Sequence, residues 1–249
     1  MTDHRSHPNP SLRGWHLGPG IQQPGLYYRF MRRGCHALCT TLWNTRVYNR
    51  HLEPPTGGVV YVSNHQSFLD PVLATMALRR PGNYMARDSL FRNPLFCNLI
   101  DSLNAFPIRR GAADLAALKE AMRRLKGGRT LVIFPEGTRT KDGTINPFLP
   151  GVAILSQRAA EWTVPVVIDG AFDAWPRSQA LPRPGRIAVQ YGQPVHQSDA
   201  RKLDAQAFVD NLRHKMIDIQ TDIRRRIGRG ELRYPDAERM SSHRDRQSI

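Results

Sequence analysis

A histidine and an aspartate lie five positions apart in the segment Asn-His-Gln-Ser-Phe-Leu-Asp (residues 64–70), which follows an apolar run. A carboxylate that contacts one ring nitrogen fixes the tautomer of an imidazole and leaves the other nitrogen able to take a proton. Asp70 precedes Pro71, a residue suited to the first turn of a helix, so we expect Asp70 to cap that helix and its side chain to fold back onto His65. The pair predicts general-base chemistry on a hydroxyl, although the spacing alone also fits a loop histidine beside a capping aspartate.

Two later segments supply groups suited to holding an anion. Residues 106–111 (Phe-Pro-Ile-Arg-Arg-Gly) contain adjacent arginines, and residues 134–139 (Phe-Pro-Glu-Gly-Thr-Arg) contain an acid, a glycine and an arginine. A guanidinium binds the oxygens of a phosphate in pairs, and a glycine lets backbone approach a ligand closely. Because a carboxylate repels phosphate, we expect Glu136 to take a hydroxyl or to hold an arginine.

Short apolar runs alternate with helical patterns from residue 57 onward, which predicts an α/β fold with a mixed, largely parallel sheet flanked by helices. The predicted strands are 59–62, 130–134, 164–168 and 186–191, with a weaker candidate at 104–108. The predicted helices are 71–78, 112–126, 152–161 and 200–227. Each chemical segment follows a strand, where ligands collect in open α/β sheets.

The predicted domain organisation has four parts. Residues 1–24 are rich in Pro, Gly, His and Ser and are expected to be disordered; residues 25–52 form an amphipathic helical segment; residues 53–228 form the main domain; and residues 229–249 form a mobile charged tail.

The formal net charge of +15, from 36 basic against 21 acidic residues, favours a polyanionic partner. The segment between Arg33 and Arg46 is too short to span a bilayer, but aromatic residues interleaved with arginines suit a membrane interface. The alternative is a helix packed on the domain with its basic face in water. Without an apolar leader we expect a peripheral protein at the cytoplasmic face of an anionic membrane.

Three cysteines do not build a disulfide framework in a chain of this length, and Cys35, His36 and Cys39 supply too few ligands for zinc. We therefore expect no metal and no cofactor, since glycine-rich nucleotide-binding loops are also missing from the sequence. The sequence also lacks a nucleophile elbow, which favours direct transfer over a covalent intermediate on the enzyme.

The order of the motifs, ending in Val-Pro-Val-Val-Ile-Asp-Gly at 164–170, resembles that of the glycerolipid acyltransferases, typified by 1-acylglycerol-3-phosphate acyltransferase. The resemblance covers roughly residues 57–195. It implies transfer of a fatty acyl group from acyl-CoA or acyl carrier protein to the hydroxyl of a lysophospholipid, in phospholipid biosynthesis. It also implies catalytic residues His65 and Asp70, and it assigns Pro165 to the acyl tunnel or to packing. The acceptor site that it implies consists of Arg110, Glu136, Gly137, Thr138 and Arg139.

Arg109 departs from the acidic or small residue that many members carry, which leaves the acceptor head group open; a lyso-ornithine lipid is one alternative. A second alternative is hydrolysis of a thioester or a lipid, because water could replace the acceptor alcohol at His65. A lipid-binding module without catalysis is a third. A basic nucleic-acid-binding protein is an outside alternative prompted by Arg224-Arg225-Arg226, but the sequence lacks its usual motifs, so we expect no nucleic-acid partner.

Overall fold

The strands of the chain gather into one sheet, and its helices pack against both faces. The computed structural model describes residues 25–92, 100, 104–108 and 114–234. Within these ranges, the strands are β1 (Arg46–Tyr48), β2 (Val59–Ser63), β3 (Tyr84–Arg87), β4 (Ala105–Ile108), β5 (Thr130–Ile133), β6 (Trp162–Asp169), β7 (Ala188–Tyr191) and β8 (Val195–His196). The helices are α1 (Leu26–Trp43), α2 (Asp70–Leu73), α4 (Leu115–Lys126), α5 (Gly151–Arg158), α6 (Ala171–Ala174), α7 (Gln197–Ala200) and α8 (Ala205–Arg226), with short 3-10 turns η2 (Arg50–Leu52) and η3 (Asp88–Arg92).

The described strands form an eight-stranded sheet in the order β1-β7-β6-β2-β5-β3-β4, with β8 also paired to β6. β2 lies inside the sheet, parallel to both β5 and β6. Among the strands of the described ranges, the pairs of β6 with β7 and with β8 are antiparallel and the others are parallel. The predicted mixed, largely parallel sheet flanked by helices is confirmed.

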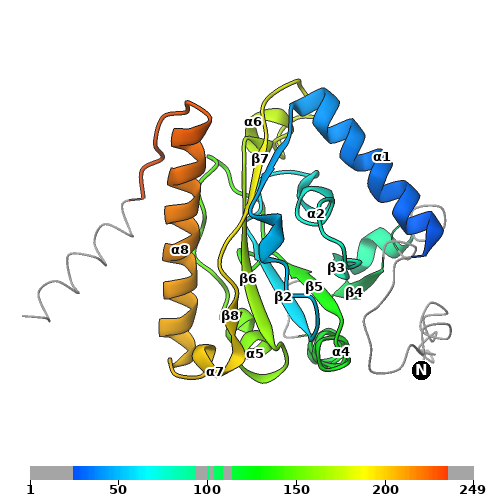
Figure 1. Cartoon of the computed structure of the whole chain (residues 1–249), viewed down its shortest axis with the longest axis vertical. Helices are drawn as coiled ribbons and strands as arrows, with labels where there is room; N and C mark the ends of the chain where they lie inside the picture. Colours follow the sequence, from blue (N-terminus) through cyan, green and yellow to red (C-terminus); the bar gives the residue numbers. More distant parts are fainter. Residues whose placement is uncertain (1–24, 93–99, 101–103, 109–113, 235–249) are drawn as a thin grey trace, which may run out of the picture.

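Alternate residues of β2 face the two sides of the sheet. Val60 and Val62 belong to a core beneath α4, α5 and α8, whereas Val59 and Tyr61 belong to a core beneath α1, α2 and α6. Figure 1 shows α8 along one face and α1 with α2 on the other. All of β2 is buried, as its unbroken β-branched and aromatic run requires of a strand covered on both faces.

Aspartate caps mark the starts of α4 and α8, a few residues after the predicted starts at 112 and 200. The Asp114 carboxylate accepts a hydrogen bond from the Ala117 amide at 3.0 Å, and α4 ends at Gly127. The Asp204 carboxylate caps α8 through the Ala207 amide at 2.9 Å. These bonds satisfy amides that the first turn of a helix leaves unpaired. The predicted start of the helix 200–227 is wrong: α8 begins at Ala205, after the cap at Asp204, and residues 197–200 form the separate short helix α7.

The predicted helical segment 25–52 is wrong beyond Trp43. α1 ends at Trp43, where Asn44 takes a left-handed conformation (φ 40°), and residues 46–48 form β1. β1 pairs in parallel with β7, with Arg46 opposite Ala188. A three-residue strand carries almost no local signal, so only its distant partner decides that it forms.

Two further boundaries differ from the prediction. Helix α2 is limited to Asp70–Leu73 rather than extending from 71 to 78. The proposed mobile tail begins too early, because Arg229 contacts Asp173 at 2.6 Å and Tyr234 is buried with its hydroxyl bonded to Gln220. The predicted disorder of residues 1–24 and the remainder of the tail, 235–249, lie outside the described residues.

Candidate active site

His65 and Asp70 meet just beyond the carboxyl end of β2. The distance from His65 Nδ1 to Asp70 Oδ2 is 2.7 Å, which confirms the predicted contact. Because an ionised carboxylate only accepts hydrogen bonds, Nδ1 is the donor, and the neutral ring then carries its lone pair on Nε2. The His65 side chain retains 13% of its exposure, so a small group can reach the ring.

The Asp70 side chain is fully buried and organises the loop before it. Oδ2 also accepts the backbone amides of Gln66 at 2.5 Å and Ser67 at 2.7 Å. The prediction that Asp70 caps its helix is therefore wrong, since its carboxylate binds amides upstream rather than amides of α2. Burial raises the pKa of the Asp70 carboxyl, while the hydrogen bond from His65 and the two amide bonds oppose that rise.

The loop after β5 holds His65 from three directions. The His65 amide donates to Glu136 Oε1 at 2.8 Å, and its carbonyl accepts the Thr140 amide at 2.8 Å. Its ring stacks on Phe134, with centroids 4.3 Å apart and planes at 23°. The two motifs that are distant in sequence therefore build one rigid site, because β2 and β5 are neighbours in the sheet.

Glu136 contacts backbone and amide groups rather than the partners expected from the sequence. Oε2 accepts the Asn146 amide at 3.0 Å and Asn146 Nδ2 at 2.8 Å, while Oε1 accepts His65. The residue is only 8% exposed. Burial raises the pKa of Glu136 to about 7, against the hydrogen bonds from Asn146 and His65. In this structure the carboxylate fixes the backbone of His65, and neither a hydroxyl nor an arginine is among these contacts.

Gly137 and Thr138 form the exposed tip of the same loop. Gly137 has φ 70°, and its amide bonds to the Phe134 carbonyl at 3.1 Å. A side chain at position 137 would be strained at this φ, and its Cβ would lie 3.1 Å from Leu149 Cδ1. Glycine is thus required by a tight turn, and it leaves backbone accessible beside the His65 loop.

Arg139 returns toward the loop that carries His65. Its guanidinium carbon lies 3.6 Å from the centre of the Phe68 ring. Arg139 therefore lies next to the loop that carries His65. A side chain that holds an anion near His65 needs such a position. Arg110, the second predicted anion-binding arginine, lies with Arg109 and Gly111 outside the described residues.

The sequence reasoning missed three residues that shape the site. Asn64, fully buried, exchanges two 2.8 Å hydrogen bonds with the backbone of Ile168 and so ties the β2 loop to β6. Asn146 holds Glu136, and Trp175 packs against Phe68, with ring centroids 5.3 Å apart. Asn64 sits beside His65 in the motif and could have been suspected; the other two carry no local signal.

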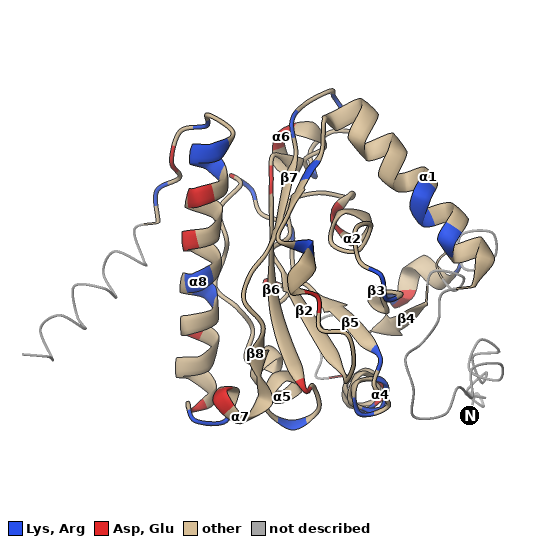
Figure 2. Cartoon of the chain, in the orientation of Figure 1, with Lys and Arg blue, Asp and Glu red and all other residues tan. Residues whose placement is uncertain are grey.

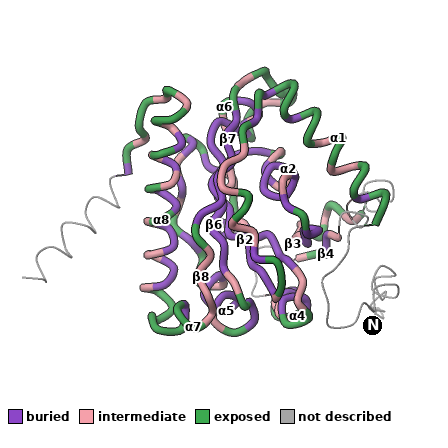
Figure 3. The backbone as a smooth tube through the Cα atoms, viewed as in Figure 1, coloured by how far each residue is buried: buried purple, intermediate pink, exposed green. Residues whose placement is uncertain are grey.

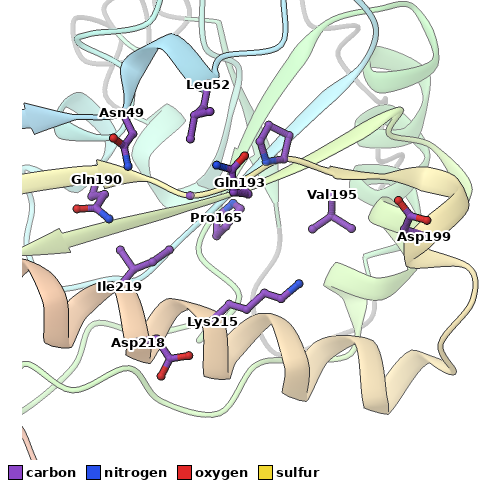
Figure 4. A pocket seen from close by; sticks show the side chains of 12 residues that line it. Asn49, Leu52, Pro165, Gln190, Gln193, Val195, Asp199, Lys215, Asp218 and Ile219 are labelled. Atoms are coloured by element: carbon purple, nitrogen blue, oxygen red, sulfur yellow. The ribbon is translucent and has the colours of Figure 1, made fainter.

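Pro165 lies away from these residues, on the α8 side of β6. It lines an open groove of about 560 Å³ between β7, η2 and α8, shown in Figure 4. Leu52 and Ile219 supply apolar walls, and Lys215, Asp199 and Asp218 supply charges of both signs. The groove is lined by neither His65 nor Arg139, so the assignment of Pro165 to an acyl tunnel stays a prediction.

Comparison with known proteins agrees with the motif order. A family model described as Acyltransferase matches residues 44–169, which include His65, Asp70 and the loop after β5. The chain belongs to the acyltransferase family. The match covers half of the chain and ends where β6 ends, so it contains the three strand ends that build the site.

Individual acyltransferases support the resemblance to the glycerolipid branch. A 1-acyl-sn-glycerol-3-phosphate acyltransferase of Bacillus subtilis is 27% identical over 173 residues, which is 69% of this chain and 84% of that protein. The alpha form from Mus musculus is 31% identical over 189 residues, 73% of this chain and 66% of that protein. A chloroplastic form from Arabidopsis thaliana is 31% identical over 144 residues, 57% of this chain but only 40% of that protein.

The crystal structure of the 1-acyl-sn-glycerophosphate acyltransferase PlsC from Thermotoga maritima has the same fold. It superposes with a TM-score of 0.64 at 23% identity, over 77% of this chain and 79% of that chain. The shared architecture confirms the fold predicted from the acyltransferase motifs.

Proposed function

We propose that this acyltransferase moves a fatty acyl group from acyl-CoA or acyl carrier protein to the free hydroxyl of 1-acylglycerol-3-phosphate, or of a related lysophospholipid, in phospholipid biosynthesis. The observation that carries the proposal is the 2.7 Å contact between His65 Nδ1 and Asp70 Oδ2 at the end of β2, with Arg139 stacked on the loop between them. The names of these relatives, which are 1-acyl-sn-glycerol-3-phosphate acyltransferases, support the choice of acceptor.

In the proposed step, His65 Nε2 takes the proton as the acceptor oxygen attacks the thioester carbonyl. A C–O ester bond forms, the C–S bond breaks, and the departing thiolate recovers the proton from the imidazolium. Asp70 stabilises the imidazolium in between. General-base catalysis of this kind contributes about 10²–10⁴-fold, and a thioester is activated enough to need no metal or covalent enzyme intermediate.

The acceptor phosphate is proposed to bind at Arg139, Gly137 and Thr138; the family resemblance adds Arg110, which lies outside the described residues. A planar guanidinium is suited to two phosphate oxygens, and the exposed turn at Gly137 supplies accessible backbone. Glu136 supports this site indirectly, because its oxygens hold His65 and Asn146.

The test is thiol release from acyl-CoA with and without lysophosphatidate. We expect acceptor-dependent release by the wild-type protein and at least a 10²-fold lower kcat for His65→Ala with an unchanged circular dichroism spectrum. His51→Ala, at an exposed histidine of η2, is the matched control and should retain activity. Release that does not depend on an acceptor would indicate hydrolysis, and a preference for lyso-ornithine lipid within a panel of acceptors would change the assigned substrate.

We further propose that the protein acts at an anionic membrane, on its cytoplasmic face, through α1. In the part of the chain that the structure describes, no helix is both long and apolar enough to cross a bilayer. Instead, α1 buries Tyr28, Cys39 and Trp43 against the domain. Its exposed large apolar residues are Leu26, Tyr27, Phe30, Leu38 and Leu42. At about 100° per residue they cover an arc of about 160° that excludes the buried residues.

Basic groups border one edge of this exposed face. Arg29 and Arg33 are exposed on the N-terminal half of α1, where Figure 2 shows its positive charges, and Figure 3 shows the outward side of the helix exposed. An apolar face bordered by arginines is the pattern of a helix that lies in the interface of an anionic bilayer.

Flotation with vesicles tests this contact. The wild-type protein should float with vesicles that contain phosphatidylglycerol and less with pure phosphatidylcholine, and Phe30→Ser with Leu38→Ser should abolish flotation. Leu203→Ser, at an exposed leucine before α8, is the control and should float normally. Equal binding by all variants would reject α1 as the membrane contact.

A further inference from the structure

Phe68 is a large apolar side chain in the catalytic loop that neither the core nor the proposed chemistry accounts for. It lies between His65 and Asp70 in sequence, yet 51% of it is exposed. One neighbour of its ring is the guanidinium of Arg139, whose carbon is 3.6 Å from the ring centre. A second is the Trp175 ring, whose centroid is 5.3 Å away with a 46° angle between the planes.

These three residues come from three adjacent strand ends. Phe68 follows β2, Arg139 follows β5, and Trp175 directly follows α6, the helix after β6; the sheet order is β6-β2-β5. Further bonds hold Trp175 in place, because the Ser67 hydroxyl donates to its carbonyl at 2.8 Å and its indole nitrogen donates to the Gln179 carbonyl. The Phe68 ring is therefore supported from the β6 side and carries the arginine from the β5 side.

Stacking of this kind acts on the orientation of Arg139. A free arginine side chain samples many rotamers, and ordering it on ligand binding costs conformational entropy. A stacking contact restricts the plane of the guanidinium, and it does not use the N–H groups, which lie in that plane at its edge. A phosphate binds that edge with two parallel hydrogen bonds.

We propose that Phe68, backed by Trp175, is a positioning residue that fixes the Arg139 guanidinium for the acceptor phosphate and so favours phosphate-bearing over uncharged acceptors. The inference rests on the proposed function. It differs from a role in packing, which would affect all acceptors equally, and from contact with an acyl chain, which would also affect all acceptors of the same chain length.

The experiment compares lysophosphatidate with the monoacylglycerol of the same chain, using one acyl-CoA. Phe68→Leu should raise KM for lysophosphatidate about fivefold, the factor expected when one partly exposed cation–π contact is lost, and should change kcat/KM for monoacylglycerol less than about twofold. Phe68→Tyr retains a ring face and should behave as wild type. If Phe68→Leu unfolds, Phe68→Met keeps the apolar volume and provides the same comparison.

Tyr48→Leu is the matched control, because it removes another aromatic ring under an arginine: Arg226 lies 5.7 Å from the Tyr48 ring, outside the site. It should leave the ratio between the two acceptors unchanged. In an Arg139→Ala background, Phe68→Leu should have no further effect on that ratio, because its proposed action passes through the guanidinium.

The outcomes separate the two proposals. Absence of acyl transfer by the wild-type protein would reject the proposed function. Transfer with a ratio that Arg139→Ala leaves unchanged would reject the phosphate site. A ratio that falls in Arg139→Ala but not in Phe68→Leu, or an equal loss with both acceptors in Phe68→Leu, would overturn the role of Phe68 alone.

Discussion

Replacement of Asp70 by asparagine separates the effect of charge from the effect of shape in the proposed catalytic pair. Asp70→Asn keeps an oxygen that can accept the amides of Gln66 and Ser67, so the loop should fold. It removes the negative charge 2.7 Å from His65 Nδ1. In the proposed mechanism that charge matters most once His65 has taken the proton, because the carboxylate then faces an imidazolium.

The size of the effect follows from the geometry. Two unit charges about 4 Å apart interact by about 4 kcal/mol at an effective dielectric of about 20, and each 1.36 kcal/mol corresponds to about tenfold in rate. We therefore expect kcat to fall about 10³-fold, with little change in KM for lysophosphatidate. The burial of Asp70 supports a value of this order, since water does not screen the pair.

The assay is initial thiol release from acyl-CoA at saturating lysophosphatidate, with circular dichroism and thermal unfolding as folding controls. Asp199→Asn removes an exposed carboxylate paired with Lys202 and should leave kcat within about twofold of wild type. If well-folded Asp70→Asn keeps more than a tenth of the wild-type kcat, the carboxylate does not stabilise an imidazolium, and the reasoning is refuted.

Two further predictions concern the residues that hold the site. The folded-state pKa of Glu136, about 7, lies above the ordinary 4.5, so its contribution to stability is complete below pH 4.5 and is lost as pH rises through 7. Urea titrations of wild type and Glu136→Gln, whose side chain does not titrate, should be compared across this pH range. The free energy of unfolding of wild type should fall by up to about 3 kcal/mol relative to that of the variant. Equal pH dependence of the two proteins would contradict this. Asn64→Ala should lower the free energy of unfolding by about 3 kcal/mol, because it leaves the buried N–H and C=O of Ile168 without their partners. Gln206→Ala, at an exposed position, is the control. A loss under about 1 kcal/mol in Asn64→Ala, similar to that of the control, would be inconsistent with the role of Asn64.

Much of the fold follows from local patterns in the chain. The run Val59–Ser63 is apolar without alternation, which fits only a strand covered on both faces, and it forms the interior strand β2. The apolar residues of α8 recur at helical spacing from Phe208 to Ile223, which predicts the helix, although it begins at Ala205 rather than at residue 200. β1 could not be predicted in this way, because its three residues form a strand only through hydrogen bonds to the distant strand β7.

In the candidate site, too, local contacts could be predicted and contacts between distant residues could not. The residue types and their short spacing identified His65 with Asp70, since both lie in one loop and the contact is local. The partners of Glu136 could not be predicted, because Asn146 is ten positions away and His65 is 71 positions away. The same is true of Trp175, which lies more than one hundred residues from Phe68.

The sequence by itself determined the chemical groups, the strands that carry them and the family to which the chain belongs, because each of these is written in types and spacings of neighbouring residues. Only the tertiary structure decided that Glu136 holds the backbone of His65, that Arg139 lies on Phe68, and that Asp70 binds amides behind it rather than ahead. The physical reason is that a side chain settles on whichever partners lie within hydrogen-bonding or stacking distance once the strands align, and the order β6-β2-β5 brings together loops that are remote along the chain.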